Sequence, residues 1–193
     1  MLETRDLGVG GALALRPRRF GDDRGWFSEV WNRERFTGAG IDRDWCQDNQ
    51  SLSAAVGTLR GLHYQSPPHA QAKLVRVLSG AIRDVVVDVR RGSPTYGRHA
   101  AVEVTAEALD QVFVPAGFLH GFVTLKPGTM VLYKVDAPYS AEHDGAVAWN
   151  DPDLAIDWGL GRDGLPAEPV LSAKDAAAPP LREAGLLFEM EGA

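Results

Sequence analysis

The stretch KLVRVLSGAIRDVVVDVR, residues 73–90, decides the fold class of this 193-residue chain. Its two runs rich in Val and Ile, residues 73–78 and 81–90, are typical of β-strands. The Ser79-Gly80 pair between them predicts a tight hairpin turn. Further short strands are predicted at residues 101–105, 111–114, 118–125 and 130–135. Because almost no helical periodicity separates these strands, the pattern favours an antiparallel sandwich or barrel.

The two ends of the chain differ in composition from this strand-rich middle. The best helix candidate is residues 31–40, where Asn32 can cap a short turn rich in Arg and Glu. After Trp158 the composition shifts to Gly, Pro, Ala and Asp, which predicts that a tail, residues 159–193, wraps over the domain. At about 150 residues per domain, we expect a single domain spanning residues 1–193.

Composition argues against several classes of partner. The 20 basic and 26 acidic residues give a net charge of −6, and nucleic-acid binding is not expected because phosphate contacts need clustered Lys and Arg. No apolar run approaches the ~20 residues that a membrane span needs, so neither a membrane partner nor a signal peptide is expected. The single Cys46 cannot form an internal disulfide, which predicts a reducing, cytoplasmic location.

His63, in the predicted strand TLRGLHYQ (58–65), is the first candidate for chemistry. A lone histidine in a strand is more often a structural residue than a catalyst. In a regular strand Arg60 would face away from His63, because side chains alternate between the two faces. A kink at Gly61 would turn both side chains inward.

The spacing around His63 resembles the first motif of the cupin proteins. Five residues separate Gly57 from His63 and six separate Lys73 from Gly80, as in that motif, although the stretch between Gln65 and Lys73 is longer than usual. Gln65 and Lys73 stand where the motif has its second histidine and its glutamate. Because a cation needs imidazole and carboxylate ligands and is repelled by an ammonium, we expect no metal in this barrel.

The segment PAGFLHG (115–121) matches the start of the second cupin motif, Pro-x-Gly-x-x-His, without its preceding Gly and following Asn. On its own it could equally be a β-turn leading into a strand with a structural His120. The two motifs together predict His63 and His120 inside one barrel. The expected fold is therefore all-β: a cupin, or double-stranded β-helix (jelly-roll), barrel with short peripheral helices.

Over nearly its whole length the chain resembles the dTDP-4-dehydrorhamnose 3,5-epimerase family of nucleotide-sugar enzymes. Any one matching stretch is weak, but their order along the chain is specific. The matching stretches are FGDDRGWFSE (20–29), QDNQS (47–51), LRGLHYQ (59–65), PAGFLHGF (115–122), Tyr133, WNDP (149–152) and LSAKD (171–175).

The resemblance implies an isomerase that acts on a dTDP-linked 4-keto-6-deoxyhexose. In the family reaction a carbon beside the ketone loses a proton from one face, an enolate forms, and a proton returns to the other face. Inversion at C3 and C5 converts dTDP-4-keto-6-deoxy-D-glucose to dTDP-4-keto-L-rhamnose, in dTDP-L-rhamnose or related deoxysugar biosynthesis. This chemistry needs a base, an acid and positive charge at the ketone oxygen, and neither a redox cofactor nor a metal.

The resemblance also implies four catalytic residues. His63 matches the base, and an imidazole with an unperturbed pKa near ~6.5 is available as a base at neutral pH. Asp175 matches the carboxylate that orients this histidine. Tyr133 matches the acid placed across the sugar. Lys73, together with Arg60, would stabilise the enolate oxygen electrostatically in a dry barrel.

A further set of residues matches family positions that bind the substrate. Arg24 and Lys174, with Gln47 and Asn49, would hold the diphosphate and the deoxyribose. Tyr139 would stack on the thymine through its flat face. The other matches are Phe27, Glu29 at the nucleotide end, Arg60, His120 lining the sugar pocket, and Asp144, where many relatives have Glu.

Alternative functions stay open at this point. A C3-only or C5-only epimerase would share the fold and nearly every motif. A metal-dependent cupin such as a dioxygenase is disfavoured by Gln65 and Lys73. A non-catalytic sugar-binding cupin is disfavoured because His63, Tyr133 and Asp175 all stand at their matching positions.

The resemblance finally implies a homodimer. Family members usually exchange a strand and the N-terminal segment across the interface, which leaves open whether Arg24 and Glu29 serve the partner's site.

Overall fold

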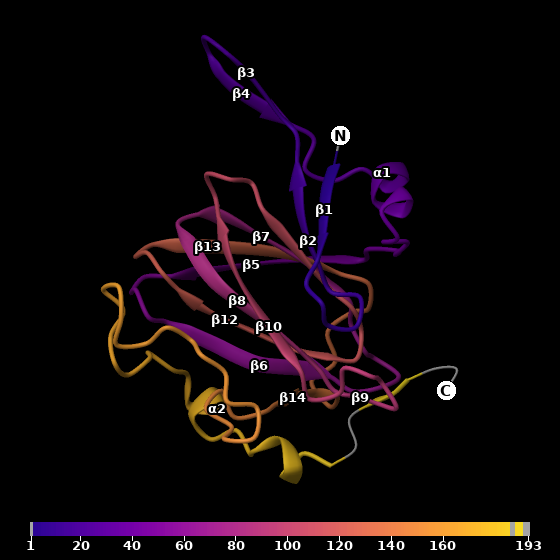
Figure 1. Cartoon of the computed structure of the whole chain (residues 1–193), viewed down its shortest axis with the longest axis vertical. Coiled ribbons are helices and arrows are strands. Elements are labelled where there is room, and N and C mark those ends of the chain that lie inside the picture. Colours follow the sequence, from indigo (N-terminus) through magenta and orange to yellow (C-terminus); the bar gives the residue numbers. More distant parts are fainter. Residues whose placement is uncertain (1, 186–187, 191–193) are drawn as a thin grey trace.

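Two facing β-sheets make up most of the computed structural model, which describes residues 2–185 and 188–190 (Figure 1). One sheet has six strands, in the order β1 (Leu2–Asp6), β2 (Leu13–Pro17), β11 (Gln111–Val114), β7 (Lys73–Ser79), β13 (Thr129–Val135) and β5 (Gln47–Ser53). The other has five, in the order β10 (His99–Thr105), β8 (Ala81–Asp88), β12 (Phe118–Thr124), β6 (Leu59–Gln65) and β14 (Asp144–Ala146). All neighbouring strands in both sheets are antiparallel. The all-β jelly-roll barrel predicted from the sequence is confirmed.

The hairpin predicted at Ser79-Gly80 is wrong. β7 pairs with β11 and β13 in the six-stranded sheet, whereas β8 pairs with β10 and β12 in the five-stranded sheet. The turn therefore carries the chain from one sheet to the other instead of pairing the two strands that it joins. Gly80 suits this crossing because its φ is +83° and a Cβ there would lie 2.3 Å from Oγ1 of Thr129.

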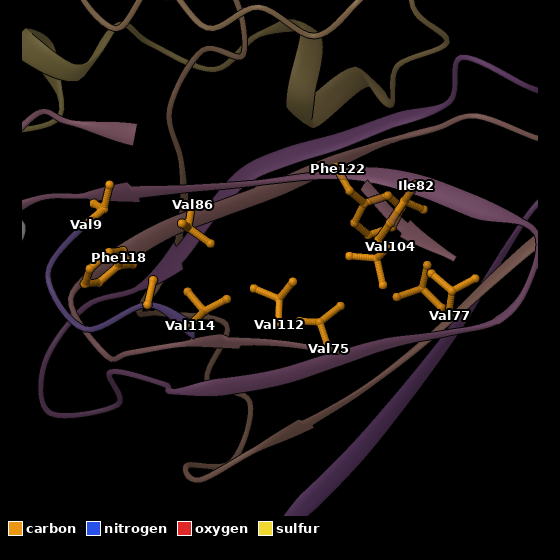
Figure 2. Packing of buried hydrophobic residues seen from close by; sticks show 12 residues of the cluster. Val9, Val75, Val77, Ile82, Val86, Val104, Val112, Val114, Phe118 and Phe122 are labelled. Atoms are coloured by element: carbon orange, nitrogen blue, oxygen red, sulfur yellow. The ribbon is translucent and has the colours of Figure 1, made fainter. Parts of the chain in front are cut away.

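Apolar side chains from the two sheets meet between them and form the core (Figure 2). Val75 of β7 packs in this cluster with Ile82 and Val86 of β8. Because side chains two positions apart in a strand point to the same face, Lys73 shares the inner face of β7 with Val75, and Asp84 shares the inner face of β8 with Ile82 and Val86. The register thus directs polar side chains into the same interior that the valines fill.

The N-terminal region extends beyond the barrel. Strands β3 (Arg19–Asp22) and β4 (Gly25–Ser28) form a hairpin that projects away from both sheets, here called the arm (Figure 1). Helix α1 (Arg33–Gly38) follows it and is shorter than the predicted helix. The Asn32 side chain accepts a hydrogen bond from the backbone N–H of Arg35, which confirms the predicted cap.

The tail lies against the face of the five-stranded sheet that points away from the core (Figure 1). It holds α2 (Ala173–Ala176), the 3₁₀ turn η1 (Leu181–Glu183) and β15 (Phe188–Glu189), which pairs in parallel with β9 (Arg90–Arg91). Leu171, Leu181 and Phe188 pack with Leu62 of β6 and Leu119 of β12 in a second apolar cluster. Within residues 2–185 and 188–190, no helix combines the length and apolar character needed to cross a bilayer.

Candidate active site

Strand β6 carries a bulge that turns two predicted site residues toward the barrel interior. On the neighbouring strand β12, His120 lies opposite His63 and Phe122 lies opposite Arg60, so β6 advances three residues where β12 advances two. Phe122 belongs to the core between the sheets, and cross-strand partners share a face. Gly61 permits the bulge, since its φ is +137° and a Cβ there would lie 2.6 Å from the backbone of β12. Of the two arrangements that the sequence left open, a regular strand or a kink at Gly61, the structure has the kink.

His63 is paired with a carboxylate that comes from the tail. Its Nε2 lies 2.6 Å from Oδ1 of Asp175, a residue 112 positions later in the chain, in α2. The backbone N–H of Asp175 donates to Oγ of Ser172, which fixes this short helix at its start. Burial favours the neutral acid, but the hydrogen bonds and charge that His63 and Ser172 offer outweigh it, so the pKa of Asp175 lies below its usual value. The pair is therefore a neutral or protonated imidazole held by an ionised carboxylate.

His120 has a carboxylate partner of its own. Its Nε2 lies 2.8 Å from Oδ2 of Asp84, on the adjacent strand β8, and both side chains are buried. The other oxygen of Asp84, Oδ1, is buried without a hydrogen-bond partner among the described residues. The structure thus contains two histidine–aspartate pairs whose histidines lie on neighbouring strands of the five-stranded sheet.

Lys73 and Tyr133 come from the opposite, six-stranded sheet. Lys73 is the first residue of β7 and is buried, and burial lowers the pKa of its ammonium to about 8. Tyr133 lies on β13 and packs against the core. Burial raises the pKa of its phenol. At neutral pH this side of the interior therefore offers a positive charge and a protonated phenol.

Arg60 is fixed toward the six-stranded sheet by hydrogen bonds to β5. Its Nε donates to Oγ of Ser53 at 3.2 Å, and one terminal nitrogen donates to the carbonyl of Leu52 at 3.2 Å. These bonds orient the guanidinium of a residue that the bulge has turned inward, so a second fixed cation accompanies Lys73.

One rim of the barrel gathers five predicted substrate-binding residues. The side chain of Gln47 donates to Asn49 at 2.8 Å and accepts from the backbone N–H of Tyr139 at 3.2 Å. The hydroxyl of Tyr139 and the ammonium of Lys174 both donate to Oδ2 of Asp144, at 3.2 and 2.5 Å. Tyr139 is 60% exposed, so its side chain is accessible to a ligand.

Three predicted substrate-binding residues are not brought to this site within one chain. Arg24 and Phe27 lie on the arm, on the opposite side of the molecule from α2 (Figure 1). Arg24 pairs with Asp22 in the arm itself, and Phe27 is 69% exposed. Glu29 follows the arm and pairs with Arg35 of α1 at 3.1 Å.

The residues at the cupin ligand positions do not fit a metal ion. The amide of Gln65 donates to the carbonyls of His69 and Pro138 and accepts from the backbone N–H of Ser140. Both of its polar atoms are therefore hydrogen-bonded to the backbone of neighbouring loops. Lys73 offers an ammonium, which cannot ligate a cation while it is protonated. Within the described part of the chain, no three His, Cys, Asp or Glu side chains form a cluster that could hold a metal.

Asp84 was not singled out by the sequence analysis. It lies in the apolar run AIRDVVVD, where nearly every residue is buried on one face or the other. A charged residue at an alternating position with Ile82 and Val86 was the available signal, since Asp is almost never fully buried unless it is paired.

Comparison with known proteins agrees with this geometry. The family described as dTDP-4-dehydrorhamnose 3,5-epimerase matches residues 6–183. A dTDP-4-dehydrorhamnose 3,5-epimerase from Sinorhizobium fredii is 49% identical over 185 residues, covering 96% of this chain and 92% of that protein. A structure from Legionella pneumophila, dTDP-6-deoxy-D-glucose-3,5-epimerase in complex with dTDP-4-keto-L-rhamnose, is 39% identical with a TM-score of 0.91, covering 99% of this chain and 100% of that one. A 3'-monoepimerase from Streptomyces bikiniensis in complex with dTDP-quinovose is 37% identical with a TM-score of 0.84, covering 94% and 90%. This chain belongs to the dTDP-4-dehydrorhamnose 3,5-epimerase family.

Proposed function

We propose that this protein is a dTDP-4-dehydrorhamnose 3,5-epimerase that converts dTDP-4-keto-6-deoxy-D-glucose to dTDP-4-keto-L-rhamnose, in dTDP-L-rhamnose or related deoxysugar biosynthesis. The observation that carries the proposal is that His63, with its buried carboxylate, extends from one sheet, while Tyr133 and Lys73 extend from the other. A sugar between the sheets would meet a base on one face and an acid on the other. Inversion of a carbon needs that arrangement, because the proton leaves one face and returns to the opposite one.

His63 removes the proton. Because an ionised Asp175 can only accept a hydrogen bond, Nε2 of His63 carries its proton and Nδ1 holds the free electron pair. Nδ1 takes a proton from the carbon beside the C4 ketone, the C–H electron pair forms the C=C bond of the enolate, and the ketone π pair moves onto oxygen. The carboxylate of Asp175 stabilises the imidazolium that results.

Lys73 and Arg60 stabilise the enolate oxygen. With a pKa of about 8, the ammonium of Lys73 is charged at neutral pH although it is desolvated. Charges fixed in a dry interior act more strongly on a developing oxyanion than charges in water, and need no rearrangement during the reaction.

Tyr133 returns the proton on the opposite face. Its phenol, kept protonated by burial, donates to the carbon as the C=C bond breaks and the ketone re-forms. Tyr133 then regains a proton from solvent and His63 loses one to solvent, which restores the enzyme before the second carbon is inverted. The steps balance without a redox cofactor or a metal.

The rim around Tyr139 binds the nucleotide in this proposal. Tyr139 presents an accessible aromatic side chain for thymine, and Lys174 supplies a cation beside it for the diphosphate. Gln47 and Asn49 line the passage from that rim to Tyr133, since Asn49 is the cross-strand partner of Tyr133. Structures of family members with dTDP or dTDP-sugars bound support a nucleotide-sugar substrate.

Deuterium exchange tests the proposed function. The protein is incubated in D₂O with dTDP-4-keto-6-deoxyglucose, and deuterium at C3 and C5 is followed by NMR. Incorporation and inversion at both carbons are expected. Incorporation at neither carbon would overturn the catalytic proposal.

A single-carbon epimerase is the second candidate. The relative that is a 3'-monoepimerase has the same fold and 37% identity, so shared architecture does not separate the two activities. The same D₂O experiment does, because exchange confined to C3 or to C5 would replace the double epimerase with this candidate.

The proposal includes a homodimer in which the arm of one chain completes the site of the other. In one chain Arg24 points into solvent at the tip of the arm and three large apolar residues of the arm are exposed, namely Phe20, Trp26 and Phe27. An apolar, protruding hairpin is typical of an element that packs on a second copy. The proposed location is the cytoplasm, in keeping with a free and exposed Cys46.

Mixed dimers test the exchange of arms. Arg24→Ala and His63→Asn chains are each expected to have little activity, and are mixed after mild dissociation. If arms are exchanged, each mixed dimer contains one site with both an intact His63 and an intact Arg24, so activity returns. If each arm serves its own chain, no intact site forms and mixing restores nothing.

A further inference from the structure

Asp84 is a fully buried carboxylate on the inner face of β8 that the reaction described above does not use. Its Oδ2 accepts a hydrogen bond from His120, but its Oδ1 is buried with no partner among the described residues. Burying an ionised carboxylate costs free energy unless hydrogen bonds and an opposite charge offset the loss of water. The hydrogen bond from His120 leaves one of the two oxygens of Asp84 unsatisfied, so a further cation facing this interior would offset the cost of burying it.

Lys73 is the buried cation that faces Asp84 from the opposite sheet. Three charged groups act on its ammonium: Asp84 and Asp144 favour its protonated form, and Lys174 disfavours it. Asp144 already accepts hydrogen bonds from Tyr139 and Lys174 at the rim. By contrast, Oδ1 of Asp84 accepts no hydrogen bond from the described residues. Among the charges that favour a protonated Lys73, that of Asp84 has the largest effect, and both side chains are buried on inner faces of the two sheets.

We propose that Asp84 is a positioning residue that keeps the Lys73 ammonium charged inside the barrel and, through its other oxygen, orients His120. The inference rests on the proposed epimerase function, in which the enolate oxygen needs a positive Lys73. Without Asp84, desolvation would act on Lys73 with less opposition, and the lysine would be neutral over much of the working pH range. A neutral lysine can donate a hydrogen bond to the oxygen but cannot supply the charge.

Direct titration of Lys73 tests the proposal without any substrate. The chain has four lysines, Lys73, Lys126, Lys134 and Lys174, so the Cε signals of a ¹³C-lysine-labelled protein are few, and Lys73→Met assigns one of them. In the wild-type protein we expect Lys73 to titrate near pH 8. In Asp84→Asn its pKa should fall by about 1 pH unit or more, since a neighbouring carboxylate raises the pKa of a cation by that amount.

Matched variants separate charge from structure. Asp88→Asn removes the other fully buried carboxylate of β8, whose partners are Arg90, Ser93 and Thr95, and should leave the pKa of Lys73 unchanged. Asp84→Glu retains the charge, so the pKa of Lys73 should stay close to its wild-type value. Asp84→Ser is a second neutral variant in case Asp84→Asn does not fold. If neither neutral variant folds, a wild-type Lys73 that titrates below about pH 7 overturns the proposal, and one that titrates near 8 supports it.

Kinetics supply the functional readout. In Asp84→Asn the fall of kcat on the basic side of its pH profile should move to lower pH together with the pKa of Lys73. For a shift of about one pH unit, turnover at about pH 8 should fall about fourfold more than turnover at about pH 6.5, and a larger shift should widen this difference. A structural role alone would lower turnover equally at all pH values, and an unchanged pKa of Lys73 would overturn the proposal. The two hypotheses fail separately. If the pKa of Lys73 shifts in Asp84→Asn but the wild-type protein does not epimerise, only the proposed function is contradicted. If the protein epimerises but the pKa of Lys73 does not shift, only this inference is contradicted.

Discussion

Two histidine–aspartate pairs lie side by side in this barrel, on residues that face each other across β6 and β12. In the pair His63–Asp175 the imidazole side chain is 33% exposed, and in the pair His120–Asp84 it is 8% exposed. A base that must exchange its proton with water after each turnover needs the first environment. The role proposed for Asp84, keeping the desolvated Lys73 protonated, needs the buried environment, because a low dielectric strengthens the interaction between two charges. The same two residue types therefore suit different tasks.

The two carboxylates also differ in how the fold positions them. Asp84 lies on β8, directly hydrogen-bonded to β12, so strand register alone sets its distance from His120. Asp175 reaches His63 only because the tail packs on the outer face of the five-stranded sheet and Ser172 caps α2. The pair His63–Asp175 thus depends on the docking of the tail, whereas the pair His120–Asp84 is part of the barrel.

The largest expected difference between the pairs is in proton exchange. His63→Asn should reduce deuterium incorporation at both C3 and C5 by about 10⁴-fold, at the upper end of what a positioned base contributes. His120→Asn keeps a donor for Asp84 and should change exchange by no more than about 10²-fold, the upper end of what one hydrogen bond to a charged group contributes. Both are measured by NMR in D₂O. If His120→Asn abolishes exchange at one carbon only, His120 is a second base and the two pairs share one task.

Sequence reasoning could predict one pair and not the other. The strands follow from β-branched runs such as residues 81–90, but propensity does not say which strands pair, and for that reason the hairpin at Ser79-Gly80 was wrong. Asp175 stands 112 positions from His63, so only resemblance to a family could connect them. Asp84 was missed because nearly every residue of its strand is buried, so the strand shows no alternation of polar and apolar residues, and a lone charge within the apolar run was the available signal. The bulge at Gly61 was predictable, since a strand glycine between two candidate residues suggests it.

In the proposed mechanism Lys73 connects the buried pair to the chemistry, and its removal should have the next largest effect. Lys73→Met keeps the apolar stem and removes the charge, so kcat should fall by about 10²–10³ with a much smaller change in substrate affinity. Arg60 can compensate in part, which would reduce the effect on kcat without moving it into binding. Steady-state kinetics at two ionic strengths measure both. Weaker, strongly salt-dependent binding with nearly normal kcat would mean that Lys73 only attracts dTDP.

Tyr133 should separate exchange from inversion. In Tyr133→Phe, His63 can still remove and return a proton on its own face, so deuterium should continue to enter while inversion falls by about 10², at the lower end of a general acid's contribution. The ratio of exchanged to inverted sugar, read from one NMR series, isolates the acid from the base. Inversion at the wild-type rate would make Tyr133 a packing residue.

The smallest expected effect is on stability, and it tests the environment of Lys73 in the absence of substrate. Burial holds the pKa of Lys73 at about 8 in the folded chain, against an ordinary value of 10.5. Between these values the unfolded chain retains a proton that the folded chain has released, so the free energy of unfolding rises with pH. From about pH 7 to about pH 9 the contribution of this lysine is about 1.4 kcal/mol, roughly one pKa unit.

Urea unfolding of the wild-type protein and Lys73→Met at several pH values measures this contribution. Other groups titrate equally in both proteins, so only the difference between the two curves reports on Lys73. That difference should grow with pH, in favour of the wild type. Parallel curves would mean that Lys73 keeps an ordinary pKa and that its ammonium reaches water. Asp84 would then face no desolvated ammonium. The proposed electrostatic role of the buried pair His120–Asp84 would be contradicted, and only the proposed role of the more exposed pair His63–Asp175 would remain.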